Sequence, residues 1–199
     1  AKLIGDLIEG ATQVATFFAI AFLITLVLLF AYSRCHYATA ITLLCSTIAV
    51  VWQLGLLRTL GYGLDPYSML VPFLVFAIGI SHGVQMINTI AIQATFGATA
   101  GTAARGTFRR LCVPGLIALV SDGIGFFTLR VIDIPVIKEL AVTASLGILV
   151  LVLTNLVLLP LLMSFTGVSR MCRGFYGSRR GRPQPLWQVV SHFSEPRTA

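Results

Sequence analysis

The chain has 199 residues, of which 57% are hydrophobic and 11% are charged, and its formal net charge is +7. Soluble domains carry about 25% charged residues, so this composition excludes an ordinary soluble domain and indicates an integral membrane protein. The positive charge does not indicate nucleic-acid binding, because the basic residues lie in short segments between long apolar runs, where membrane orientation explains them.

Long apolar runs predict five transmembrane helices, since about 20 apolar residues suffice to cross the hydrocarbon core of a bilayer. Residues 1–12 predict an interfacial lead-in helix with one apolar face. The transmembrane domain is expected over residues 13–165, with spans at about 13–32, 38–57, 69–91, 111–131 and 140–165. The spans lack the strict alternation of polar and apolar residues seen in membrane β-strands. The predicted fold class is therefore an all-α integral membrane protein.

Two further segments are expected to lie at the membrane surface. Residues 94–110, small and polar with three arginines, predict a surface helix between the third and fourth spans. Residues 166–199 form an arginine-rich tail, in which apolar residues at 186–193 predict a second interfacial helix. Since the chain begins at Ala1 without a signal peptide, we expect a piece of a longer protein.

The basic residues predict the orientation. Five spans put the two ends of the chain on opposite sides, and most arginines fall on the side of the C-terminal tail. Lys2, Arg58, Arg130 and Lys138 fall on the other side. By the positive-inside rule, the C-terminal tail is cytoplasmic and the N-terminal end is extracytoplasmic.

Two ionisable groups lie inside apolar spans, and such groups are costly in a membrane and commonly functional. His82 lies about 20 Å from the outer end of the third span, and Asp122 about 14 Å from the outer end of the fourth, at 1.5 Å per residue. Their depths differ by about one helical turn, so they can meet directly or through a water. An imidazole and a carboxylate in such a pair titrate together near neutral pH. The pattern predicts a proton relay, and a static pair that holds two helices together is the alternative.

Other residues in the spans are expected to support this pair or to pack helices. The supporting polar positions are Ser81, Gln85, Asn88 and Asn155. The small residues expected to allow close helix packing are Gly79, Gly83, Gly123 and Gly125. No catalytic set, metal-ligand spacing or phosphate-binding loop is present in the sequence. The sequence therefore predicts no enzyme, no cofactor and no metal site.

Two stretches carry a family resemblance. LVPFLVFAIGISHGVQMIN is similar to the fourth membrane helix of the resistance–nodulation–division (RND) superfamily, with its glycine-rich FxxAIG followed by a polar pair. PGLIALVSDGIGFFTLRVIDIPVIKELAVTASLGILVLVLTNLVLLPLLM resembles the fifth and sixth helices, with a GF motif, a DIP-type loop and a helix ending in LLP. The resemblance covers residues 1–165 as helices two to six and is closest to the MmpL-like branch, which exports hydrophobic molecules. The same helices form the sterol-sensing domain of patched-like proteins.

The resemblance implies a twelve-helix transporter of two similar halves, driven by proton influx through acidic residues in the fourth helix. Here Ser81 and His82 stand at the usual Asp-Tyr pair. Asp122 lies where many members carry a small polar residue, so our hypothesis is that Asp122 with His82 replaces the usual acid. The arginine-rich tail would link the two halves.

These observations predict a segment of a proton-driven exporter of lipids or other hydrophobic molecules in the bacterial inner membrane. A sterol- or lipid-sensing module that binds without transporting is the alternative, and a buried acid such as Asp122 favours the exporter. An inert scaffold leaves Asp122 unexplained. The expected partners are the bilayer, a hydrophobic substrate and the remainder of the transporter. A second copy of the chain is a further candidate partner, and nucleic acid is not one.

Overall fold

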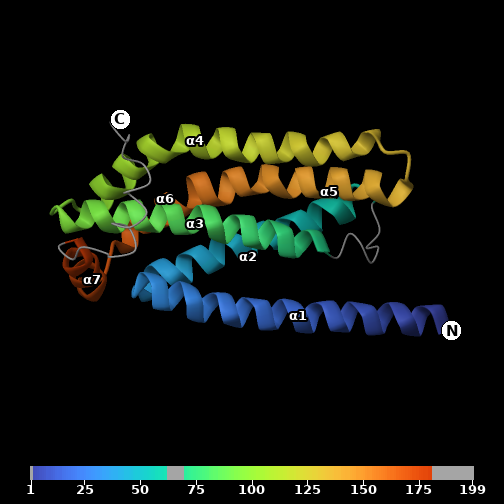
Figure 1. Cartoon of the computed structure of the whole chain (residues 1–199), viewed down its shortest axis with the longest axis horizontal. Coiled ribbons are helices and arrows are strands. Elements are labelled where there is room, and N and C mark those ends of the chain that lie inside the picture. Colours follow the sequence, from blue (N-terminus) through green and yellow to red (C-terminus); the bar gives the residue numbers. More distant parts are fainter. Residues whose placement is uncertain (1, 62–69, 181–199) are drawn as a thin grey trace, which may run out of the picture.

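In the computed structural model, residues 2–61 and 70–180 are described, and they form helices joined by short turns, without a strand (Figure 1). The elements are α1 (Lys2–Ser33), α2 (His36–Thr59), α3 (Val71–Thr95), α4 (Ala100–Thr128), the 3-10 turn η2 (Leu129–Val131), α5 (Pro135–Leu151), the π-helical segment η3 (Val152–Leu158), α6 (Leu159–Thr166) and α7 (Arg170–Arg180). An all-helical structure satisfies its backbone hydrogen bonds internally, as lipid requires.

Within the described residues, five helices are long and apolar enough to cross a membrane, which confirms the predicted fold class. The candidate spans are Thr12–Ser33, His36–Thr59, Val71–Thr95, Ala100–Val131 and Pro135–Thr166, the last combining α5, η3 and α6. Residues 2–12, expected as an interfacial lead-in, continue without a break into the first span. The interfacial helix expected at 186–193 lies outside the described residues.

The spans alternate in direction, so the N-terminus and α7 lie at opposite ends of the bundle (Figure 1). α2, α3 and the α5–α6 helix supply most of the buried core, whereas α1 and α4 flank it. Phe18 of α1 packs edge-to-face on Phe73 and Phe76 of α3, with ring centroids 5.1 and 5.3 Å apart. These aromatic contacts attach α1 to the bundle.

The surface helix expected at 94–110 is not a separate element. α3 extends to Thr95, Gly97 makes the turn with a φ of +87°, and α4 then runs from Ala100 to Thr128. The side chain of Thr99 caps α4 by accepting a hydrogen bond from the Thr102 N–H at 3.4 Å. The first part of α4 runs obliquely to the remainder (Figure 1), and Pro114 lies inside the helix. A proline in a helix interior bends it, because it removes one backbone hydrogen bond.

Pro160 has a related effect in the last span. Its ring nitrogen cannot donate to the carbonyl one turn earlier, and the wide π-helical turn η3 directly precedes it. π-helical turns occur as local bulges inside α-helices, frequently at functional sites. Here the bulge contains Asn155, which is fully buried.

α7 folds back against the turn between α1 and α2, a contact that the sequence did not predict. The Cys172 thiol donates to the Ser33 carbonyl at 3.6 Å, and the Ser169 hydroxyl lies 3.9 Å from the Cys35 sulfur. Both cysteines are fully buried, so this contact fixes α7 to the bundle.

Candidate functional site: a polar face and a buried polar layer on α3

His82 and Asp122 lie on neighbouring antiparallel helices, α3 and α4. The Asp122 carboxylate is near enough to His82 to attract a protonated imidazole electrostatically. His82 is half-buried, whereas Asp122 is exposed on the outside of the five-helix bundle. Within the described residues, no direct hydrogen bond joins the two side chains.

The supporting polar residues of α3 share this outward face. Ser81 and Gln85 are exposed, and Asn88 is half-buried. The hydroxyl of Thr89 donates to the Gln85 carbonyl at 3.0 Å, so it is satisfied within its own helix. Polar side chains on a membrane helix rarely face lipid. This face of α3 therefore fits against water or another protein surface better than against acyl chains.

The opposite face of α3 is closed. Gly79 and Gly83 are both buried there, against α2 and the last span. A Cβ atom at Gly79 would lie 2.8 Å from the Ser46 hydroxyl and 3.1 Å from the Asn155 amide nitrogen. A Cβ atom at Gly83 would collide with the methyl group of Thr42. The two glycines thus let α2 and η3 approach the α3 backbone.

The other two glycines are on α4 and differ from each other. A Cβ atom at Gly123 would be in ordinary van der Waals contact with Ile148, at 3.7 Å. The Gly123 carbonyl accepts a hydrogen bond from the Ser145 hydroxyl at 3.0 Å. Gly125 faces open space, so the described residues give it no packing partner.

A layer of buried polar side chains lies behind the glycine face. Thr42, Ser46 and Gln53 project from α2, Asn155 projects from η3, and none of the four has exposed surface. The Gln53 amide donates to the Thr143 carbonyl at 3.4 Å. In the described residues, the hydroxyls of Thr42 and Ser46, the Gln53 carbonyl oxygen and both amide atoms of Asn155 have no hydrogen-bond partner.

Such groups are costly to bury, because each buried polar atom without a partner loses its hydrogen bonds to water. The Ser46 hydroxyl and the Asn155 amide both lie close to Gly79, so these two unpartnered polar groups stand next to the same point of α3. The sequence interpretation counted Asn155 among the positions that support the His82–Asp122 pair, and it left out Thr42 and Ser46. Their signal was the spacing of Thr42, Ser46 and Gln53, which lie on one face of α2.

The site holds no recognisable metal centre. Within residues 2–61 and 70–180, no group of three or more His, Cys, Asp or Glu side chains is placed to hold a metal ion.

Comparison with known proteins decides the family. The model of the MMPL family matches residues 3–199, nearly the whole chain. The chain belongs to the MMPL family. No curated protein matches it. The predicted resemblance to the MmpL-like branch of the RND superfamily is therefore confirmed, and with five apolar helices the chain is a multi-pass membrane protein with a transport-related function.

Proposed function

We propose that this MMPL-family chain is the transmembrane part of an exporter of lipids or other hydrophobic molecules in the bacterial inner membrane, driven by proton influx. In this proposal His82 and Asp122 pass the proton. The observation that supports it is the placement of an imidazole and a carboxylate near each other on two adjacent antiparallel membrane helices, α3 and α4.

The energetics support a functional role for the pair. A carboxylate near the centre of a membrane costs about 2.5–3.5 kcal/mol to insert, and Asp122 makes no hydrogen bond or ion pair within the described residues that offsets this cost. Uptake of a proton by the imidazole–carboxylate pair raises the net charge of the pair by one, and release of that proton lowers it again. Such a change can be coupled to a conformational step.

The exposed polar face supports the expectation that the remainder of the transporter covers it. Ser81 and Gln85 extend the face beyond His82, and both are exposed. A covering protein surface or a water-filled path between two halves would hydrate or pair these groups. The proposed orientation, with the arginine-rich end in the cytoplasm, follows from the positive-inside rule.

The test is Asp122→Asn in the full-length transporter, reconstituted in vesicles with an imposed proton gradient. We expect at least a tenfold loss of transport at unchanged expression, because the amide keeps the shape of the side chain and cannot carry the proton. The matched control is Asp133→Asn, an exposed acid that pairs with Lys138 at 2.5 Å outside the proposed relay. Transport by Asp122→Asn at the wild-type rate would refute the relay.

A further inference from the structure

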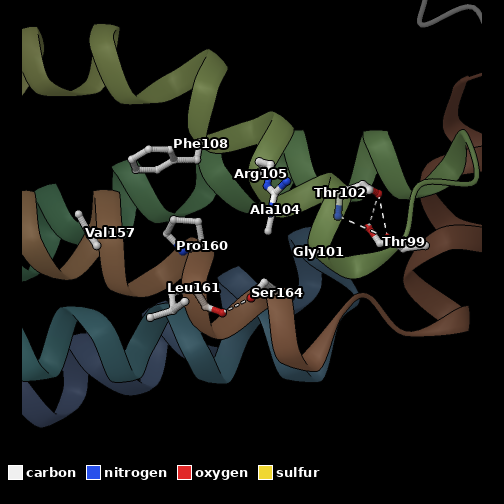
Figure 2. Close-up of a pocket in the computed structure, with 10 residues that line it drawn as sticks. All are labelled: Thr99, Gly101, Thr102, Ala104, Arg105, Phe108, Val157, Pro160, Leu161 and Ser164. Carbon is white, nitrogen blue, oxygen red and sulfur yellow. Dashed lines mark hydrogen bonds between the residues drawn. The ribbon is translucent and has the colours of Figure 1, made fainter.

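A cavity of about 530 Å³ lies between the first part of α4 and the last span, away from the His82–Asp122 pair. Figure 2 shows Arg105 and Phe108 of α4 on one side of it, and Val157 and Leu161 on the other. The cavity reaches from the start of α4 towards the interior of the span. Its volume is that of an ordinary small-ligand site.

The cavity has one cationic end and an apolar remainder. Arg105 is exposed, and the part of the chain that the structure describes gives it no ion pair. The hydroxyl of Ser164, also in the wall, donates to the Leu161 carbonyl at 2.6 Å and is therefore occupied. The apolar walls are solvent-accessible: Val157 is 48% and Leu161 is 51% exposed. In a membrane such surface contacts acyl chains.

The surroundings favour a negatively charged occupant. The cavity opens at the end of the bundle where the described basic residues are all arginines: Arg34, Arg105, Arg109, Arg110, Arg170 and Arg173. Among residues 2–61 and 70–180, no Asp or Glu lies at this end. An arginine guanidinium binds phosphate oxygens with two parallel hydrogen bonds. Basic groups at a membrane surface also attract anionic lipids.

The local sequence keeps the cavity open. A Cβ atom at Gly101 would meet nothing within 4 Å, so the start of α4 leaves space where a larger side chain would fill it. The oblique course of the first part of α4 also turns this segment away from the line of the remaining span (Figure 1). The opening is therefore built into the backbone and does not depend on one movable side chain.

We propose that this cavity binds an anionic phospholipid from the leaflet at the arginine-rich end. The headgroup phosphate lies at Arg105, and an acyl chain runs along Phe108, Val157 and Leu161. The order of the lining residues matches the order of groups in the lipid, charged at the helix end and apolar towards the membrane interior. This binding goes beyond the proposed transport cycle and requires no proton relay.

The test is lipid retention measured by native mass spectrometry on the full chain purified in a mild detergent. The chain is titrated with dioleoyl-phosphatidylglycerol and, separately, with zwitterionic dioleoyl-phosphatidylcholine. We expect preferential retention of phosphatidylglycerol. Arg105→Gln should weaken its binding about fivefold, the effect of one basic group beside an anionic lipid surface. Arg109→Gln, on the same helix but outside the cavity, is the matched control and should retain wild-type binding.

A second variant tests the shape of the site independently of its charge. Gly101→Leu adds a side chain at a position where a Cβ atom would meet nothing within 4 Å. It should occupy part of the cavity and reduce phosphatidylglycerol binding while leaving the thermal unfolding of the protein unchanged. Equal binding by wild type and Arg105→Gln would overturn the proposal. A loss of binding in Arg109→Gln as large as that in Arg105→Gln would also overturn it, because that result indicates attraction by diffuse surface charge. Displacement of the lipid by millimolar inorganic phosphate would also overturn it, since that result indicates an anion site without a chain.

The lipid-binding test is independent of the transport proposal. Asp122→Asn should bind phosphatidylglycerol as the wild type does, because Asp122 does not line the cavity. Failure of lipid binding leaves the relay standing, and failure of the relay leaves the lipid site standing.

Discussion

The two faces of α3 differ in what covers them. On one face, Gly79 and Gly83 let α2 and η3 approach so closely that an added Cβ atom would collide. On the other face, Ser81 and Gln85 are exposed, and His82 is half-buried in the neighbourhood of Asp122 of α4. One helix therefore carries a closed packing surface and an open polar surface.

The difference indicates a division of tasks within the span. Inside a membrane, close van der Waals packing replaces the hydrophobic effect as the force between helices, and the glycine face provides it. A rigid closed face can hold the open face at a fixed angle and depth. The open face keeps polar groups accessible to water or to a partner, as the proposed proton transfer requires.

The largest expected effect comes from closing the contact at Gly83. Gly83→Ala would push a methyl group against Thr42, and overpacking of this kind costs about 1–3 kcal/mol. We expect a lower unfolding temperature in detergent. Fluorescence-detected size exclusion after heating measures this temperature. The matched control is Gly125→Ala, also in a helix but facing open space, which should cause no loss. Equal behaviour of the two variants would show that the closed face is not closely packed.

A smaller effect of opposite sign is expected at Asn155. Its amide is fully buried, and neither amide atom has a hydrogen-bond partner in the described residues. Asn155→Leu should therefore raise the free energy of unfolding by about 1 kcal/mol, since it removes an unsatisfied buried group. Asn88→Leu, on the open face, serves as the control and should bring no such gain. A loss of stability in Asn155→Leu would instead indicate an ordered water bound to the amide.

The sequence was sufficient for the parts of the structure that depend on hydropathy. The lengths of the apolar runs predicted five long helices, because the bilayer thickness sets one dominant length. The positions of His82 and Asp122 in adjacent spans followed from counting residues along antiparallel helices. What counting could not provide was the direction in which each side chain points, so the outward position of Asp122 came only from the structure.

The remaining features depend on contacts between distant segments. Ser46 and Asn155 both approach Gly79, and three helices must be placed before this meeting of residues can be recognised. The contact of Cys172 with Ser33 joins residues far apart in the chain. The sequence also did not predict that Arg105 belongs to the same helix as the fourth span. A run of small and polar residues predicts a separate surface segment equally well.

The smallest effect on folding is expected on the open face of α3. Ser81→Ala combined with Gln85→Ala should change the free energy of unfolding by less than about 0.5 kcal/mol, because both side chains are exposed and away from the core. Thermal unfolding of the purified chain measures this value. The same double variant in the full-length transporter should lower stability or transport, because there a second protein surface is expected to pair with these groups. If the chain alone loses more than 1.5 kcal/mol, the face is already paired within these five helices, and the contrast between the two faces of α3 fails.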